Sequence, residues 1–519
     1  MQQKTRGAIA AGHPQTAQAG LEMLKQGGNA FDAALAALLA SFVTESPLTS
    51  AGGGGFLLAY TQQQQAILFD FFTQTPRRKK PEAQLDFYPV DVDFGGAIQE
   101  FHIGLGSMAV PGNLAGVFHV HQRLGKLPMR AIAEPALHYA RSGVEVNAFQ
   151  AFLLHLLKPI LLASEAGRTI YAPSGHLARV GERLFFKDFA QTLTQVIEEG
   201  IHTFYTGEIA HRLIQDCQHL GGYLSLEDLQ AYQVIERQPL SLDYRGYRLL
   251  TNPPPSAGGT LIAFALGLLS QFDLSQTRWG GVEHLQILAE VMRLTNTARQ
   301  EVFNAQVHQD DIVEKFLALD HLKTYAQQLS QSVNKLGSTT HISAMDEWGN
   351  AASVTSSNGE GSGYFIPQTG IMINNMLGEE DLNPFGFHNW QENVRISSMM
   401  SPTIAIADNS PKIVLGSGGS NRIRTAILQV ISNLIDFQMP ADIAVSSPRV
   451  HWENYKFDVE SGRLTEDELK LHFSDRQQVS LWQQQNMFFG GVHTVCRSAT
   501  GDFTGSGDPR RSGAIAILD

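Results

Sequence analysis

The order of strand-like and helix-like segments is the feature that most constrains the fold of this 519-residue chain. β-Rich runs occur at residues 56–71 and again after residue 336, whereas residues 110–320 are mostly helical in pattern. The order contains no clean series of β–α–β units, which would be typical of a parallel sheet. We therefore predict an α+β fold in which sheets form the centre and helices cover them.

Residue patterns place the individual elements. Residues 30–43 are almost entirely apolar apart from Asp32, which predicts a helix that is buried on most sides. Further predicted elements are a helix at 15–26, a hairpin formed by 56–60 and 66–72, a second hairpin formed by 341–346 and 351–357, β-like runs at 370–375, 403–407, 412–416 and 513–518, and a helix at 422–437.

Composition excludes several classes of protein. With 43% apolar and 17% charged residues, the chain can bury a large core. Its formal net charge of −12 argues against nucleic-acid binding, because phosphate recognition needs a concentrated basic surface. The dense basic run at 77–80 is expected to be a solvated loop. Cys217 and Cys496 lie too far apart in sequence to indicate a disulfide framework or a zinc site, and we expect both to be buried thiols.

Membrane and export signals are not evident in the sequence. The first fifteen residues lack the apolar region of a secretory signal, and no uninterrupted apolar run approaches the roughly 18 residues that a membrane span needs. We expect a soluble, cytoplasmic protein without a membrane partner.

Several catalytic motifs can be tested and rejected. The glycines at 52–55 are not followed by Lys and Ser or Thr at the spacing of a phosphate-binding loop, and Gly104 and Gly106 lack the third glycine of a dinucleotide-binding turn. The sequence also contains no H-E-x-x-H motif and no G-x-S-x-G motif. Metalloprotease and α/β-hydrolase interpretations therefore have no support.

Two short segments remain that could carry chemistry. Residues 416–420, Gly-Ser-Gly-Gly-Ser, follow a strand and precede a helix, so their consecutive backbone N–H groups could hold an oxyanion. Glycine-rich turns of this kind also occur for purely steric reasons. Thr339, at the head of a predicted strand, is a candidate nucleophile.

Ordered motifs along most of the chain connect these segments. They are GGNAFDAA at 27–34, AGGGGFLL at 51–58, AVPGNLAG at 109–116, PPPSAGG at 253–259, TTHIS at 339–343, INN at 373–375, MSPT at 400–403 and DPRR at 508–511. From Gly7 to its end the chain thus resembles the γ-glutamyltranspeptidase family, whose members are N-terminal-nucleophile hydrolases. The resemblance implies an αββα four-layer sandwich and an autoprocessed precursor. Its large subunit would be residues 1–338 and its small subunit residues 339–519, forming one intertwined unit.

The resemblance also implies a mechanism. The Thr339 hydroxyl would attack the carbonyl of Ser338, and hydrolysis of the resulting ester would free a new N-terminal threonine. Its α-amine, with an ordinary pKa near about 8, can serve as general base for its own hydroxyl. The backbone N–H groups of Gly419 and Ser420 correspond to the oxyanion hole, and Ser357 corresponds to the supporting threonine of the family. This mechanism requires no metal and no organic cofactor.

The expected acyl-binding residues depart from the family pattern. An arginine that grips the substrate α-carboxylate is replaced by Phe72, and a serine pair beside it becomes Ser398 and Met399. The loss of a bidentate arginine is the weightier change. Met376 replaces an amide side chain, Gly359 replaces an asparagine, and Glu379 is the better candidate, ahead of Glu380, for holding the substrate amino group.

These departures favour an amide hydrolase whose acyl pocket prefers a group less polar than γ-linked glutamate. Water rather than an amine is the expected acceptor, and the substrate is a small-molecule amide. Two alternatives stay open. In the first, the chain is an ordinary glutathione-hydrolysing γ-glutamyltransferase in which Arg77 or Arg395 supplies the carboxylate grip. In the second, it is an unprocessed homologue that binds a ligand without catalysis.

Overall fold

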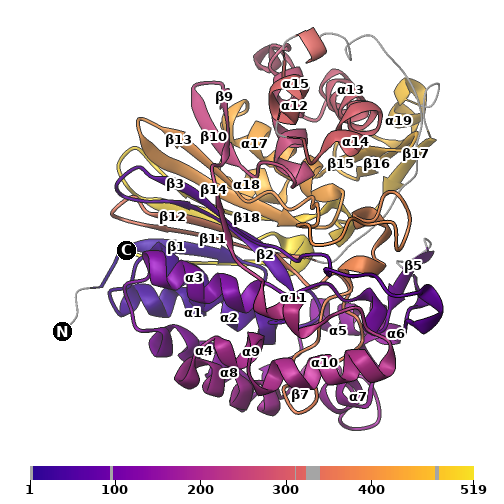
Figure 1. Cartoon of the computed structure of the whole chain (residues 1–519). Helices are drawn as coiled ribbons and strands as arrows, with labels where there is room; N and C mark the ends of the chain where they lie inside the picture. Colours follow the sequence, from indigo (N-terminus) through magenta and orange to yellow (C-terminus); the bar gives the residue numbers. More distant parts are fainter. Residues whose placement is uncertain (1–3, 94–97, 310, 319, 323–338, 474–477) are drawn as a thin grey trace.

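A computed structural model describes residues 4–93, 98–309, 311–318, 320–322, 339–473 and 478–519. Two stacked sheets form its centre, and helices cover both outer faces, giving four layers (Figure 1). The predicted α+β class and αββα sandwich are confirmed. The start of β1 lies beside the C-terminal end of β20, because Gly7 is paired with Leu518.

The first sheet has seven strands, and every neighbouring pair is antiparallel. In spatial order they are β20 (Ala514–Leu518), β1 (Gly7–Ala11), β11 (Thr340–Asp346), β12 (Ala351–Ser357), β2 (Gly54–Tyr60), β3 (Ala66–Phe71) and β8 (Ile235–Arg237). β11 and β12 are buried at every residue because one face of the sheet meets the second sheet and the other meets helices.

The second sheet has six strands and packs on the first through β14 and β18. Its spatial order is β19 (Phe503–Ser506), β18 (Gly491–Arg497), β14 (Ser410–Gly418), β13 (Thr403–Ala407), β10 (Tyr247–Thr251) and β9 (Leu240–Tyr244). Both sheets therefore combine strands from before and after residue 338. The division into two subunits stays a prediction.

Helix α2 (Ala30–Thr44) anchors the layer beneath the first sheet. All 15 of its residues are buried, between β11 and β12 on one side and α1 (Pro14–Lys25) and α4 (Met129–Ser142) on the other. Asn29 caps its N-terminus in a capping box with Asp32. The Asp32 carboxylate also accepts the backbone N–H groups of Lys126 and Leu127, which explains how one acidic residue is tolerated in this helix.

The other outer layer consists mainly of α12 (Ala257–Leu269), α13 (Val282–Ala298) and α17 (Arg422–Ile435) (Figure 1). Further α-helices in the described residues are α3 (Asn113–Leu124), α5 (Ala148–Leu156), α6 (Lys158–Leu161), α7 (Glu165–Tyr171), α8 (Lys187–Glu199), α9 (His202–Tyr205), α10 (Glu208–Leu220), α11 (Leu226–Gln230), α14 (Asn304–Gln306), α15 (Ile312–Phe316), α18 (Ala441–Ser446) and α19 (Glu466–Phe473). Short sheets are formed by β4 (Tyr88–Asp93) with β5 (Ile98–Ile103), β6 (Val144–Glu145) with β7 (Arg183–Leu184), and β15 (Val450–Glu453), β16 (Lys456–Glu460) and β17 (Gln478–Trp482).

Most predicted elements are present, and the differences have local causes. Residues 370–375 form no strand of either main sheet, and only Met372 and Ile373 make isolated bridges, to Phe365 and Gly52. The mostly helical stretch also contributes β8, β9 and β10. Strand β1 was not predicted, because its small residues give a weak strand signal.

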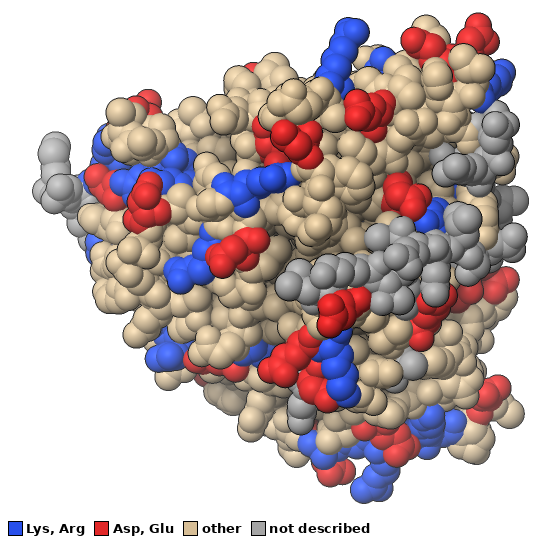
Figure 2. Space-filling model, turned by 90° about the horizontal axis from the view of Figure 1, so that it is seen from above, with Lys and Arg blue, Asp and Glu red and all other residues tan. Residues whose placement is uncertain are grey.

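Surface and cysteine predictions have mixed outcomes. Residues 77–80 lie in a loop outside helices and strands, as expected. Cys217 is buried, whereas Cys496 is only half-buried, and both are free thiols. On the face shown in Figure 2, basic and acidic side chains are interspersed.

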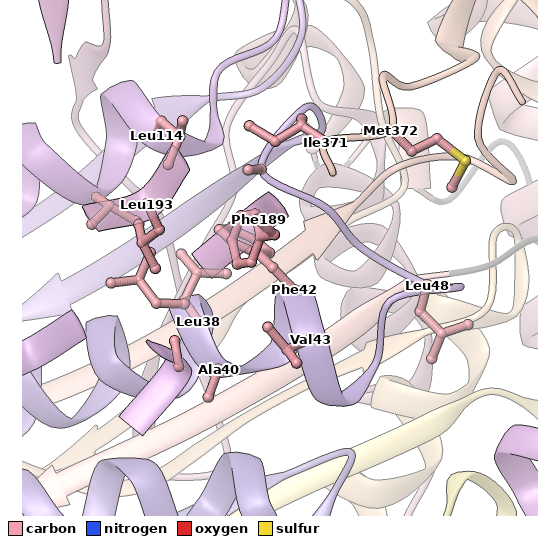
Figure 3. Packing of buried hydrophobic residues seen from close by; sticks show 14 of the residues in the cluster. Leu38, Ala40, Phe42, Val43, Leu48, Leu114, Phe189, Leu193, Ile371 and Met372 are labelled. Atoms are coloured by element: carbon pink, nitrogen blue, oxygen red, sulfur yellow. The ribbon is translucent and has the colours of Figure 1, made fainter. Parts of the chain in front are cut away.

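The packing of α2 gives a stability prediction. Leu38 is fully buried and lies in the cluster of Figure 3, where Phe42 of the same helix meets Phe189 edge to face with ring centroids 6.5 Å apart. We expect Leu38→Ala to lower the free energy of unfolding by about 2–5 kcal/mol, because it leaves a cavity between packed layers. The urea midpoint of unfolding measures this. Leu471→Ala, at a position that is 74% exposed, is the control, and an equal effect of both variants would contradict the assigned core.

Candidate active site

Thr339 lies at the head of a central strand. It directly precedes β11, which is paired with β1 on one side and β12 on the other. Thr340 is opposite Ser356, so Thr339 lies close to Ser357 at the end of β12. The Thr339 Oγ1 and Ser357 Oγ atoms are 3.3 Å apart, and both residues are 5% exposed. Ser338, the predicted partner in autocleavage, lies outside the described residues.

The chain turns sharply after Ser357. The Ser357 Oγ accepts a hydrogen bond from the N–H of Gly359 at 3.0 Å. Gly359 has a φ of +62°, and a Cβ there would lie 2.2 Å from Asn375 Oδ1 and 2.5 Å from Glu379 Oε1. A side chain at position 359 would therefore need a strained backbone and would displace two polar groups. The local structure at position 359 therefore favours glycine over the asparagine of the family pattern.

Glu379 forms the acidic side of the site. It is buried, and its Oε1 accepts the N–H of Glu360 at 2.9 Å. Burial raises the pKa of Glu379 well above its ordinary value, and the nearby carboxylates of Glu360 and Asp381 raise it further. A cationic amine bound here would reverse this shift by favouring the charged carboxylate.

The glycine-rich turn joins β14 to α17, as predicted, although β14 extends to Gly418. Gly419 and Ser420 have φ angles of +123° and +48°. Within the described part of the chain, neither of their backbone N–H groups makes a hydrogen bond, so both are available to a ligand. A left-handed serine costs roughly 1–2 kcal/mol. The hydrogen bond from Ser420 Oγ to Asp381 helps to offset this cost.

Arg511 connects the C-terminal DPRR motif to Thr339. Its Nη1 donates to the Thr339 carbonyl oxygen at 3.1 Å. A Cβ at Gly418 would lie 2.0 Å from that oxygen, so only glycine permits the turn to approach so closely. Burial lowers the pKa of Arg511 to about 10, against the opposing effect of Asp508, Glu360 and Glu45. Arg511 therefore remains charged at neutral pH.

Glu45, at the end of α2, supports the residue after Thr339. Its carboxylate accepts hydrogen bonds from the Thr340 hydroxyl and, at 2.7 Å, from the Thr16 hydroxyl. Burial raises the pKa of Glu45 to about 7, while the Thr340 and Thr16 hydrogen bonds and the charge of Arg511 act in the opposite direction. The Glu45 carboxyl therefore titrates near neutral pH, and it contacts Thr340, the residue that follows Thr339.

The residues predicted to catalyse and to bind the acyl group share one small cavity of about 40 Å³. Phe72, which stacks on Phe56 with ring centroids 5.4 Å apart, forms part of its apolar wall. The predicted residues that line the cavity are Phe72, Thr339, Ser357, Gly359, Met376, Glu379, Ser398, Met399 and Ser420. The wall also contains residues that were not predicted, Asp381, Leu382, Met400 and Ile423. Gly419 adjoins the cavity through the turn. Ser398 directs its Oγ to the N–H of Met400 at 3.1 Å.

Arg395, one candidate for a rearranged carboxylate grip, is engaged elsewhere. Its Nε lies 3.3 Å from Asp70 Oδ1, and its Nη1 and Nη2 donate to the carbonyl oxygens of Phe72, at 2.5 Å, and Gln233, at 2.7 Å. The guanidinium carbon also lies 4.8 Å from the Tyr232 ring centroid. Arg77, the other candidate, donates its backbone N–H to Asp228 and does not line the cavity. The Arg395 guanidinium is therefore held by other groups, and neither arginine belongs to the lining of the small cavity.

The supporting residues Arg511 and Glu45 differ in how well the sequence predicted them. Arg511 belongs to the DPRR motif, which carried part of the family resemblance. Glu45 had no such signal, because nothing in the sequence places the end of α2 beside β11. Among the described residues, no group of three His, Cys, Asp or Glu side chains could hold a metal ion, and no helix has the length and apolarity needed to cross a bilayer.

The αββα sandwich and the threonine at the head of a central strand define the class of the chain, the N-terminal-nucleophile hydrolases. The sequence profile described as Gamma-glutamyltranspeptidase matches residues 16–518. The chain belongs to the γ-glutamyltranspeptidase family. It is thus an amidohydrolase or acyltransferase, as its sequence predicted at this coarser level.

Individual relatives include hydrolases and acylases. The glutathione hydrolase proenzyme of Escherichia coli (strain K12) is 30% identical and aligns with 97% of this chain and 90% of its own length. The acylase ACY 1 proenzyme of Pseudomonas sp. (strain V22) is 27% identical, over 88% of this chain and 84% of its own. The crystal structure of cephalosporin acylase from Bacillus halodurans has a TM-score of 0.87 at 25% identity, covering 99% of this chain and 96% of that one.

The raised pKa of Glu45 predicts a pH-dependent stability. Its ordinary value is 4.5 and its folded-state value is about 7, so the folded state binds the proton more tightly. This contribution to stability is fully present below pH 4.5 and is lost as the pH rises through about 7. We expect wild-type stability to fall relative to Glu45→Gln across that window, by roughly 1.4 kcal/mol for each unit of pKa shift.

Thermal unfolding of wild type and Glu45→Gln from pH 4 to 8 measures this difference. Glu198→Gln, which makes the same charge change at an exposed position of α8, is the control. Parallel stability curves for wild type and Glu45→Gln would contradict the assigned titration.

Proposed function

We propose that this chain is an autoprocessed amide hydrolase in which Thr339, freed as an N-terminal residue, forms an acyl-enzyme and passes the acyl group to water. The observation that carries the proposal is the position of the Thr339 hydroxyl. It lies 3.3 Å from Ser357 Oγ and faces a cavity bordered by a turn with available N–H groups. Processing between Ser338 and Thr339 is part of this proposal.

In the proposed reaction, the α-amine of Thr339 accepts the proton of its own hydroxyl as Oγ1 attacks the amide carbonyl carbon. The carbonyl oxygen becomes an oxyanion held by the N–H groups of Gly419 and Ser420. The tetrahedral intermediate collapses, the C–N bond breaks, and the protonated α-amine donates its proton to the leaving amine. Water then attacks the ester by the same route and releases the acid.

Ser357 and Arg511 are assigned positioning roles. Ser357 lies within reach of the Thr339 hydroxyl and is itself oriented by the Gly359 N–H. Arg511 holds the Thr339 carbonyl oxygen and so restricts rotation of the nucleophilic residue. These contacts hold the nucleophile in place before substrate arrives, which reduces the entropic cost of the reaction.

The acyl group is proposed to be less polar than γ-linked glutamate. Phe72, Met376 and Met399 form the part of the cavity where the family pattern has polar or charged residues, and Arg395 is bound to Asp70 and backbone carbonyls. A buried α-carboxylate without a cationic partner would be costly. Glu379 could still hold an amino group or donate a hydrogen bond as the neutral acid.

A second candidate is hydrolysis of γ-glutamyl compounds, including glutathione. It is supported by Glu379 in the site and by the name of the Escherichia coli relative, glutathione hydrolase proenzyme. In that case the α-carboxylate of the γ-glutamyl substrate would bind without an arginine partner. The first candidate is therefore favoured.

The proposed role of Thr339 as nucleophile and as the residue after the cleavage site can be tested by mass spectrometry and mutagenesis. Mass spectrometry of the purified wild type should find two fragments, which begin at Met1 and Thr339. Thr339→Ala should remain one chain and lose amidase activity by at least ~10³-fold. Ser357→Ala should lower kcat/KM by roughly tenfold, the effect of one hydrogen bond. Intact wild type that hydrolyses no amide after long incubation would instead indicate a non-catalytic homologue.

The proposed acyl preference predicts a selectivity ratio. With p-nitroaniline as the common leaving group, kcat/KM should be at least ~10-fold higher for butyryl than for γ-glutamyl, because the cavity lacks a carboxylate partner. Met399→Ser, which restores the serine pair of the family pattern, should lower this ratio. The control is Met129→Ser, at a half-buried methionine at the start of α4 and away from the cavity. Preference of the wild type for the γ-glutamyl anilide would refute the apolar assignment and support the second candidate.

A further inference from the structure

A second, larger cavity adjoins the acyl cavity. It has a volume of about 410 Å³, within the range typical of small-molecule sites, whereas the acyl cavity measures about 40 Å³. We call this larger cavity the distal groove. Its apolar wall includes Phe303, Val307, Leu377, Phe385, Trp390 and Ile396.

The two cavities are joined through a common wall. Asp381, Leu382, Ser398 and Met399 line both. Ser398 and Met399 occupy the positions where the family pattern binds the far, carboxylate end of the acyl group. Thr339 and Ser420 line only the small cavity. The distal groove therefore adjoins the acyl end of the site through Ser398 and Met399.

The volumes decide what the small cavity can hold. A water molecule needs roughly 10–15 Å³ of cavity volume by this measure, so about 40 Å³ accepts only a short chain of atoms. A longer acyl group must extend past Leu382 and Met399 into the distal groove. The groove is large enough for an aromatic ring and the methylene groups that lead to it.

The groove walls favour an apolar occupant. Phe385 is 66% exposed at its mouth, and Trp390 forms a half-buried part of the wall. Arg299, at the start of a π-helical turn after α13, lines the groove, and its Nη1 donates to Asn421 at 3.0 Å. Arg395 in the same wall is bound to Asp70. The groove thus offers broad aromatic and aliphatic contacts, and each of its two guanidinium groups already has a polar partner within the protein.

From this juxtaposition we infer that the distal groove binds the far end of the acyl group, so that the preferred substrates are amides of aryl-substituted alkanoic acids rather than of short aliphatic acids. The inference rests on the proposed function and specifies its substrate class. The groove would raise catalytic efficiency by binding the part of the acyl group that does not react.

A series of p-nitroanilides tests this inference, with acetyl, butyryl, phenylacetyl and 4-phenylbutyryl as the acyl groups. We expect kcat/KM for 4-phenylbutyryl to exceed that for butyryl by at least ~10-fold. Asn389→Trp, which places a large side chain at an exposed position of the groove wall, should remove most of this advantage while acetyl hydrolysis changes less than about twofold. Phe385→Ala should reduce the advantage in part. His472→Trp, at an exposed position of α19, is the matched control.

Binding of 4-phenylbutyrate, the expected product, is measured by calorimetry on the processed wild type and on Asn389→Trp. Binding that is lost in Asn389→Trp supports the groove even if no amide is hydrolysed, an outcome that would refute the proposed function alone. Hydrolysis with equal efficiency for butyryl and 4-phenylbutyryl would overturn the groove assignment alone. The leaving amine can also be varied at a constant acyl group, with p-nitroaniline replaced by 2-naphthylamine. If the change in kcat/KM caused by Asn389→Trp then depends on the leaving amine, the groove assignment is overturned.

Discussion

Strand β11 is held between β1 and β12 by two antiparallel ladders, and the position of Thr339 depends on both. Because side chains alternate between faces along a strand, a slip of one residue would turn every β11 side chain to the opposite face. The register that pairs Thr340 with Ser356 brings the Thr339 hydroxyl to Ser357. Both faces of β11 are buried, so such a slip would disrupt the packing on both faces and is strongly disfavoured.

A cluster of buried charged side chains near the start of β11 also fixes the position of Thr339. The DPRR motif returns to the centre of the molecule, where Asp508 pairs with Arg449 at 2.6 Å and with Arg510 at 3.2 Å. This cluster fixes the backbone that presents Arg511 to the Thr339 carbonyl oxygen. Removal of one member would leave an uncompensated buried charge, which costs more than the pair contributes. The C-terminal segment is therefore part of the site although it follows Thr339 by more than a hundred residues.

The proposed catalytic groups and the acyl-binding groups tolerate substitution to different degrees. In the proposed mechanism backbone N–H groups bind the oxyanion, so serine can stand at position 420 as long as its left-handed conformation is stabilised, here by Asp381. In the proposed mechanism side chains recognise the acyl group, so Phe72 and Met399 would change what the cavity accepts without moving Thr339. A family fold can therefore keep one reaction while its substrate range changes.

The sequence by itself determined the α+β class, the family, both main hairpins and the glycine turn, because these depend on local residue patterns and ordered motifs. It also named most residues that line the acyl cavity. Only the tertiary structure decided that Arg395 is held by Asp70, that Glu45 supports Thr340, and that Gly359 leaves no room for a side chain. The same holds for the distal groove, whose walls come from segments as far apart in the sequence as Thr75 and Met399. Local patterns specify which elements form, whereas cavities, ion pairs and close approaches arise from how distant elements pack, which no short stretch of sequence encodes.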